Sequence, residues 1–211
     1  MLEPLYYISQ ATVEKTHIDT IREVLEAGCR LVQLRIKRRP EEEVLKHAIE
    51  AKALCDEFGA RLIINDFPQV AATVGAYGVH VGLVDMSIAE VRAIVGNSMI
   101  IGGTANTFEH IRQRVNEGAS YIGLGPYRFT ITKEKLSPIL GLEGYHRILQ
   151  QCREANINLP IVAVGGIGAD DVPALFETGV DTIAMSAALT YATNKKEMVT
   201  KIVQAYAQHR Q

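Results

Sequence analysis

The feature that most constrains this chain is a repeated alternation of short apolar runs with helical segments. Eight such units fit into 211 residues, so each unit is about 26 residues long. Strands that alternate with helices predict a parallel sheet. Eight units of this length predict an α/β fold, a single (β/α)8 TIM barrel, rather than a doubly wound open sheet with edges. No linker or low-complexity run interrupts the pattern, so we expect one domain over residues 1–211.

The strands are predicted from short apolar runs bounded by glycine, proline or polar residues. The predicted strands are Leu5–Ile8, Leu31–Leu34, Arg61–Ile64, Gly78–Val81, Met99–Ile101, Tyr121–Leu124, Pro160–Val164 and Thr182–Met185. Capping residues predict where helices begin. Asp19 is predicted to cap the first helix, and Ser87 with Glu90 to form a capping box.

Composition excludes several classes of protein. The formal net charge of −2 gives no general attraction to nucleic acid. No run approaches the ~18 apolar residues of a membrane span, and the first residues predict no signal peptide. Cys29, Cys55 and Cys152 lack metal-ligand spacing and are interpreted as reduced structural thiols. We therefore expect a cytoplasmic protein that binds neither nucleic acid nor membrane.

Polar or glycine-rich segments follow seven of the predicted strands, each where the strand ends. In a (β/α)8 barrel these ends meet at one face, where active sites are built. The polar residues and glycines concerned are Arg35, Lys37, Asn65, Asp66, His80, Asp85, Thr104, Thr130, Thr132, Lys133, Gly165, Gly166 and Ser186. Their convergence predicts a catalytic rim at the C-terminal ends of the strands.

One side of this rim offers backbone groups. Gly165 and Gly166 follow the seventh strand, and the turn at Ser186 follows the eighth. Bare amides beside helix N-termini at these two positions are typical of a barrel phosphate site. The alternative is that these glycines only form a tight turn.

The opposite side combines cations with carboxylates. Arg35, Lys37 and Lys133 are expected to lie near Asp66 and Asp85. Carboxylates among phosphate-binding cations suit Mg2+, which binds through one or two carboxylates together with substrate phosphate oxygens. Salt bridges among the same residues are the alternative. Two anion sites, one with a metal, suggest that a diphosphate substrate is joined to a monophosphate substrate.

The segment Tyr127–Gly141 is long for a connection between a strand and a helix. It carries the cations Arg128, Lys133 and Lys135, which repel one another when no anion is present. We predict that it acts as a lid over a filled site. The alternative is a segment that stays packed in place whether or not a ligand is bound.

Several ordered segments resemble the thiamine-phosphate synthase family. They are Gln33–Lys37, Asn65–Asp66, Gly78–Asp85, Gly102–Thr104, Gly125–Pro126, Thr130–Lys133 and Val164–Ile167. The resemblance covers nearly the whole chain. It implies a transferase that couples hydroxymethylpyrimidine diphosphate to thiazole phosphate and releases pyrophosphate, after the pyrimidine has left as a cation.

The resemblance also implies roles for individual residues. Asp66 and Asp85 would hold Mg2+, and Gln33 would contact the pyrimidine. Thr130 and Thr132 would contact the thiazole substrate, whose phosphate would lie at Gly166 and the backbone of Ser186 and Ala187. The residues implied to bind the diphosphate are Arg35, Lys37, Asn65, Thr104 and Lys133, with Lys133, Thr104 and Arg35 acting on its departure.

The chain departs from the family pattern at Ile36, Phe67 and Leu83, which we expect to affect affinity more than activity. The main alternative function is that of the related thiazole tautomerase, an isomerase that relies on a histidine after the sixth strand. No histidine occurs there in this chain. A sugar-phosphate isomerase would need His80 and Asp66 as its acid and base, and His80 can also be interpreted as a purely structural residue.

Overall fold

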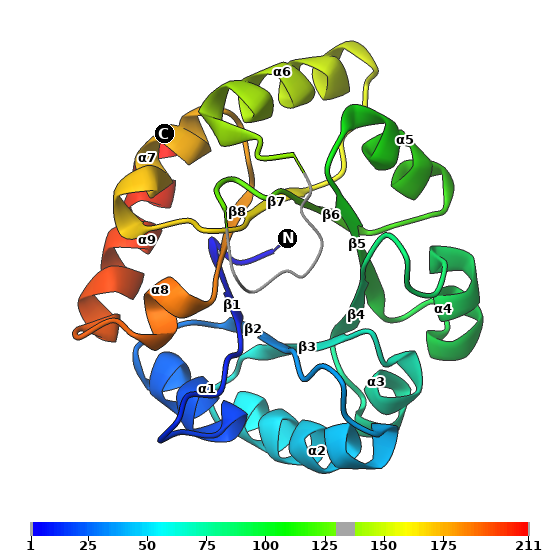
Figure 1. Cartoon of the computed structure of the whole chain (residues 1–211), viewed down its shortest axis with the longest axis vertical. Coiled ribbons are helices and arrows are strands. Elements are labelled where there is room, and N and C mark those ends of the chain that lie inside the picture. Colours follow the sequence, from blue (N-terminus) through cyan, green and yellow to red (C-terminus); the bar gives the residue numbers. More distant parts are fainter. Residues whose placement is uncertain (1, 130–137, 211) are drawn as a thin grey trace.

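The computed structural model describes residues 2–129 and 138–210, and within them eight parallel strands close into a barrel in sequence order. Figure 1 shows the strands as a central ring surrounded by helices. The strands are β1 Leu5–Ile8, β2 Leu31–Leu34, β3 Arg61–Asn65, β4 Gly78–Val81, β5 Ile100–Ala105, β6 Tyr121–Leu124, β7 Ile161–Val164 and β8 Thr182–Met185. The predicted (β/α)8 barrel is confirmed.

Helices cover the outside of the barrel (Figure 1). They are α1 His17–Glu26, α2 Glu41–Glu57, α3 Pro68–Val74, α4 Ile88–Val95, α5 Phe108–Asn116, α6 Gly141–Glu154, the 3-10 turn η1 Ala169–Asp171, α7 Val172–Glu177, α8 Ala187–Thr190 and α9 Lys195–His209. In the part of the chain that the structure describes, no helix is both long enough and apolar enough to cross a membrane.

Two apolar layers hold the barrel together. Alternate strand residues point inward or outward, so each strand contributes to both layers. Outward residues such as Val32, Ile64 and Ile122 pack against the helices in a large continuous core. A smaller inner cluster fills the barrel and consists of Tyr6, Leu31, Ile63, Tyr121, Val162 and Ala184. Full burial of such side chains stabilises the fold by roughly 1.5–3 kcal/mol each.

Capping explains where two of the helices begin. Ser87 and Glu90 form the predicted capping box of α4. The prediction that Asp19 caps α1 is wrong: Thr16 is the N-cap, and its side chain accepts from the backbone of Asp19. The Asp19 carboxylate in turn accepts from the backbone of Thr16, because Asp19 is the third residue of the helix and completes the box.

Strand β5 is longer than the sequence predicts. Gly102, Gly103 and Thr104 were expected to follow the strand, but they lie within it and pair with β6. Both glycines are needed because large side chains occupy the space where a Cβ would lie. A Cβ on Gly102 would collide with the ring of Tyr121, and one on Gly103 would lie 2.8 Å from Cδ of Arg114. The close approach of these two side chains explains why the strand contains two glycines, which are usually unfavourable within a strand.

Candidate active site

Two adjacent cavities open at the C-terminal ends of the strands. The carboxylate cavity, about 450 Å³, is lined by residues that include Gln33, Lys37, Asn65, Asp66, His80, Asp85 and Thr104. The glycine cavity, about 370 Å³, is lined by residues that include Gly165, Gly166, Ile167, Ser186 and Ala187. Ile8, Arg35, Val164 and Ala184 line both. The structure thus gathers those predicted rim residues that it describes into two neighbouring cavities.

Asp66 combines an unusual backbone conformation with an unpaired carboxylate oxygen in the carboxylate cavity. It follows β3 directly with a φ of 64°, a region that costs energy for residues with a side chain. Its Oδ2 lies 3.0 Å from Nζ of Lys37. Its Oδ1 is buried and has no hydrogen-bond partner within residues 2–129 and 138–210. One oxygen of this carboxylate is therefore left for a ligand.

Asp85 lies close to Asp66. Its Oδ2 accepts a hydrogen bond of 2.8 Å from the backbone of Gly82, where a Cβ would collide with the carboxylate. Burial raises the pKa of Asp66, the nearby Asp85 raises it further, and Lys37 opposes both effects. The pair therefore concentrates negative charge at this edge of the barrel.

This donor set fits Mg2+. Mg2+ typically binds through one or two carboxylates and completes its shell with water and substrate phosphate oxygens. Two carboxylates, one with a buried unpaired oxygen, match that requirement. Among the described residues, no group of three or more His, Cys, Asp or Glu side chains could hold a metal ion.

Asn65 presents an amide donor beside the two carboxylates. It is only 5% exposed, and its Nδ2 has no hydrogen-bond partner among the described residues. A buried unpaired donor is costly unless a ligand satisfies it. Asn65 is thus suited to donate to an acceptor oxygen in the carboxylate cavity.

Gln33 and Thr104 lie at the two ends of a hydrogen-bonded chain inside the barrel. Gln33 Nε2 donates to the hydroxyl of Tyr6 at 2.6 Å, and that hydroxyl lies 3.1 Å from the hydroxyl of Tyr121. The Tyr121 hydroxyl lies 3.1 Å from Nδ1 of His80, and His80 Nε2 lies 3.0 Å from Oγ1 of Thr104. The sequence analysis missed the two tyrosines, whose only signal was their place in the first and sixth strands.

Arg114 is a second residue that the sequence analysis missed. It lies on α5 and is 2% exposed. Its guanidinium donates to the carbonyl oxygens of Gly82, at 2.7 Å, and Thr104, at 3.3 Å. It also pairs with Glu117 at 2.7 Å. Arg114 therefore ties the loop that carries Asp85 to the strand that carries Thr104.

The glycine cavity is built mainly from backbone. Gly165 and Gly166 have φ values of 104° and 66°, which side chains rarely adopt. A Cβ on Gly166 would lie 3.0 Å from both Cβ of Arg128 and the carbonyl oxygen of Phe129. These glycines therefore let the segment after β7 pack closely against the segment after β6.

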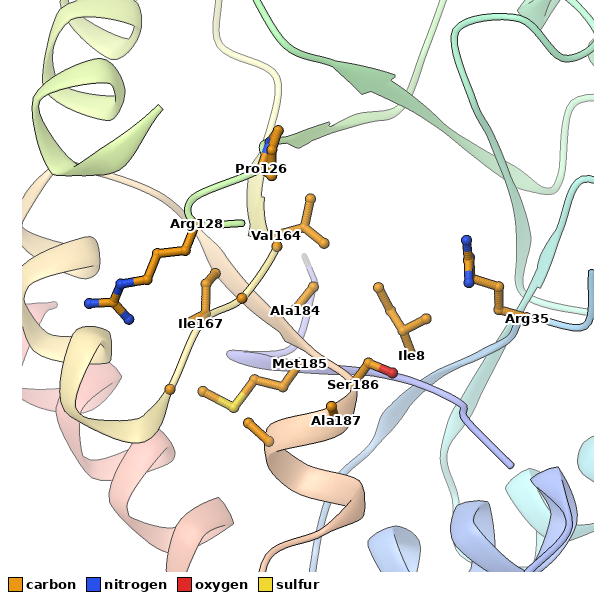
Figure 2. Close-up of a pocket in the computed structure, with 14 residues that line it drawn as sticks. Ile8, Arg35, Pro126, Arg128, Val164, Ile167, Ala184, Met185, Ser186 and Ala187 are labelled. Carbon is orange, nitrogen blue, oxygen red and sulfur yellow. The ribbon is translucent and has the colours of Figure 1, made fainter. Parts of the chain in front are cut away.

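Two polar side chains that line the glycine cavity, Arg128 and Ser186, are paired with residues outside it. Figure 2 shows Arg128 and Arg35 on opposite sides of the cavity, with the guanidinium of Arg128 directed away from it. That guanidinium binds both oxygens of Asp171, at 2.5 and 2.6 Å. Ser186 Oγ donates to Gln10 at 3.3 Å. The sequence analysis counted Arg128 among the mutually repelling cations of the predicted lid, but the structure pairs it with a carboxylate 43 residues away.

Part of the predicted site lies outside the described residues. Thr130, Thr132 and Lys133 belong to this part, as does the middle of the predicted lid. The two ends of the lid segment are described and meet: Leu140 and Gly141 donate backbone hydrogen bonds of 3.0 Å to Pro126 and Tyr127. The segment therefore leaves and returns at the same place on the rim.

Known proteins resemble this chain over most of its length. A family model described as thiamine monophosphate synthase matches residues 5–189. A thiamine-phosphate synthase of Phocaeicola vulgatus is 48% identical over 188 residues, covering 89% of this chain and 90% of the relative. One of Flavobacterium psychrophilum is 46% identical over 202 residues, covering 96% and 98%.

A solved structure agrees with these sequence relatives. Thiamine phosphate pyrophosphorylase from Pyrococcus furiosus superposes with a TM-score of 0.83 at 29% identity, covering 97% of this chain and 96% of that chain. A model match over most of the chain and relatives near 48% identity establish common descent. The chain therefore belongs to the thiamine monophosphate synthase family and is a transferase enzyme.

Proposed function

We propose that this transferase couples hydroxymethylpyrimidine diphosphate to thiazole phosphate, with release of pyrophosphate and formation of thiamine phosphate. The observation that carries the proposal is that two cavities with different polar groups share part of their lining. The carboxylate cavity offers an unpaired carboxylate oxygen and cations, and the glycine cavity offers backbone at positive φ. Arg35 lines both, so two phosphorylated substrates bound there would lie side by side.

The reaction breaks the C–O bond between the pyrimidine methylene carbon and the diphosphate. The electron pair leaves with the diphosphate, and the thiazole nitrogen then forms the new C–N bond to the methylene carbon. Negative charge grows on the leaving group, so preorganised positive charge and hydrogen-bond donors lower the barrier. No protein nucleophile is required.

The residues of the carboxylate cavity suit this task. Lys37 would neutralise part of the charge on the diphosphate, and Asn65 would donate its unpaired amide to a phosphate oxygen. Asp66 and Asp85 would hold Mg2+, which when bound supplies further positive charge to the leaving group. Arg35, Thr104 and Lys133 complete the proposed diphosphate set, and Gln33 would face the pyrimidine.

The glycine cavity would hold the second substrate. We place the phosphate of the thiazole at Gly166 and the backbone of Ser186 and Ala187, which line this cavity together. Thr130 and Thr132 would contact the ring. Ile8 and Val164 line both cavities, so apolar side chains would face the pyrimidine cation formed between the two substrates.

A coupling assay tests the proposal. Purified protein is given each substrate alone and both together, with Mg2+ or with EDTA, and thiamine phosphate and pyrophosphate are measured. We expect both products only when both substrates and Mg2+ are present. Conversion of a thiazole phosphate tautomer without the pyrimidine substrate, and no coupling, would instead favour the tautomerase alternative.

A further inference from the structure

The hydrogen-bonded chain inside the barrel crosses five strands. Gln33 on β2, Tyr6 on β1, Tyr121 on β6, His80 on β4 and Thr104 on β5 are linked by contacts of 2.6 to 3.1 Å. Gln33, Tyr6 and Tyr121 are at most 2% exposed. All five residues line the carboxylate cavity. The chain thus connects one wall of this cavity to the other below its opening.

The order of donors and acceptors in this chain follows from giving each buried hydroxyl proton an acceptor. Gln33 donates an amide N–H to Tyr6, and Tyr121 is the other hydrogen-bond partner of that hydroxyl among the described residues. The proton of Tyr6 therefore has an acceptor within the described residues when it is directed to Tyr121. Tyr121 then directs its proton to Nδ1 of His80. Burial raises the pKa of Tyr6 and of Tyr121, so each phenol keeps its single proton.

The tautomer of His80 follows from this order. Because Nδ1 accepts from Tyr121, Nε2 carries the proton of the neutral ring and donates it to Oγ1 of Thr104. A hydroxyl that accepts one hydrogen bond has its single proton free for another acceptor. The proton of Thr104 is therefore directed to a further acceptor, and this residue lines the carboxylate cavity.

The space for the two rings is built into the strands. A Cβ on Gly102 would collide with the ring of Tyr121, and a Cβ on Gly123 would lie 2.9 Å from Cε1 of His80. The rings of His80 and Tyr121 pack at a centroid distance of 5.6 Å. Two glycines on neighbouring strands thus allow these rings to meet. This packing supports the contact between His80 and Tyr121 independently of the hydrogen bond.

We propose that His80 is a positioning residue that fixes the hydroxyl of Thr104 as a hydrogen-bond donor toward the leaving diphosphate. Tyr121 and Tyr6 hold the ring of His80 in the tautomer that this requires. The inference rests on the proposed function for the identity of the acceptor, but the tautomer itself does not. A purely structural His80 would fill the same space with either ring nitrogen protonated.

The tautomer is tested without any substrate. A two-bond 1H–15N correlation spectrum of protein labelled with 15N-histidine distinguishes the two neutral tautomers, and the signal missing from His80→Asn identifies His80. We expect the Nε2-protonated form in the wild type and a mixture of tautomers in Tyr121→Phe, which keeps the ring but loses the proton donor. A protonated Nδ1 in the wild type would overturn the inference whatever the enzyme does.

The effect on the reaction is tested by two substitutions of the same residue. His80→Gln places an amide near the position of Nε2 and can still donate to Thr104, whereas His80→Asn reaches only the position of Nδ1. We expect His80→Asn to lower kcat by roughly 10- to 100-fold and His80→Gln to recover most of that loss. The KM for thiazole phosphate should change little in both. Exposed His146 on α6 provides the control, and His146→Gln should leave the kinetics unchanged.

A double-mutant cycle with Thr104→Val separates positioning from packing. If His80 acts through Thr104, His80→Asn should cause no further loss of kcat once the hydroxyl is gone. Equal losses in both backgrounds, with folded variants of matched melting temperature, would overturn the inference. Absence of coupling activity in the wild type would contradict the proposed function and leave the tautomer result standing.

Discussion

The two cavities at the rim differ in whether their polar groups are already paired within the protein. In the carboxylate cavity, Oδ1 of Asp66 and Nδ2 of Asn65 are buried without a partner among the described residues. Around the glycine cavity, Arg128 binds Asp171 through two hydrogen bonds, and Ser186 donates to Gln10. The carboxylate cavity thus contains unpaired polar side-chain atoms. The glycine cavity is lined mainly by backbone, and its polar side chains Arg128 and Ser186 have hydrogen-bond partners.

This difference indicates how each cavity binds its ligand. A buried unpaired polar atom costs about 1–3 kcal/mol, a cost that a ligand can remove on binding. The carboxylate cavity is therefore less stable when empty and gains most from a charged, metal-bearing ligand. Arg128 and Ser186 at the glycine cavity are hydrogen-bonded, so they do not carry this free-energy cost. The shape of the glycine cavity depends on the backbone conformation at Gly165 and Gly166. Substitutions should distinguish binding through unpaired side-chain atoms from binding through the backbone.

The largest effect is expected from the carboxylates. Asp66→Asn and Asp85→Asn should each lower turnover by roughly 100-fold or more, because each replaces a charged oxygen ligand by a neutral amide. Coupling rates measured over a range of Mg2+ concentrations provide the check, with circular dichroism to show that the barrel persists. Undiminished wild-type activity in EDTA would contradict the role given to these residues.

Lys133 is expected to give the next largest effect, although it lies outside the described residues. Lys133→Ala should lower kcat by roughly 10- to 100-fold with a smaller change in KM, because the cation would stabilise charge that appears only as the diphosphate departs. Steady-state kinetics with each substrate varied in turn measure both constants. A change confined to KM would mean that Lys133 contributes to binding alone.

Gly166 tests the other cavity. Gly166→Val should raise the KM for thiazole phosphate by about 10-fold, because the residue has a φ of 66° and its Cβ would press on Arg128 and Phe129. Gly168→Ala is the matched control: its Cβ would lie 3.5 Å from Asp171, with no positive φ to disturb. Equal loss of affinity for the diphosphate substrate would show that the cavities are not separate sites.

The smallest effects are a pair of stability changes with opposite sign. Burial raises the pKa of Asp66, so its charge destabilises the metal-free fold increasingly as the pH rises through that raised pKa. Burial alone would also raise the pKa of Asp171, but hydrogen bonds from Arg128 and Gly168 lower it overall. Asp171 therefore stabilises the fold above its unfolded-state pKa, and this contribution is lost as the pH falls through the folded-state value.

At pH 7 Asp66→Asn should therefore raise the free energy of unfolding of the metal-free protein by about 1 kcal/mol. Asp171→Asn should lower it by about 1 kcal/mol or less, because Arg128 is half exposed. Urea unfolding at pH 7 and at pH 4 measures both. The Asp66 difference should shrink at pH 4, whereas most of the Asp171 difference should persist because pH 4 lies above the lowered pKa of Asp171. Changes of the same sign at pH 7 would contradict the comparison between the cavities.

The barrel was predictable because its signal is local and repeated. Each short apolar run was bounded by turn residues, and strands such as Leu31–Leu34 and Tyr121–Leu124 were confirmed without a change of boundary. The errors arose where a residue's role depends on a distant neighbour. Gly102 was expected to end a strand, but it continues β5 because Tyr121 fills the space beside it.

The candidate site was predictable in its position and less so in its internal contacts. Counting residues after each strand placed Lys37 and Asp66 on the same rim, and they form an ion pair. The pairing of Arg128 with Asp171 and the link from Gln33 to Thr104 join segments far apart in the sequence, so no local pattern indicates them. The ligands and chemistry assigned to these residues stay predictions.

Calorimetric binding of two ligands to two variants tests the division of the rim most directly. Pyrophosphate with Mg2+ and thiazole phosphate are each titrated into the wild type, Asp66→Asn and Gly166→Val. We predict that Asp66→Asn loses Mg2+-dependent binding of pyrophosphate and keeps thiazole phosphate, whereas Gly166→Val shows the reverse. Variants that each weaken both ligands equally would contradict the assignment of one substrate to each cavity.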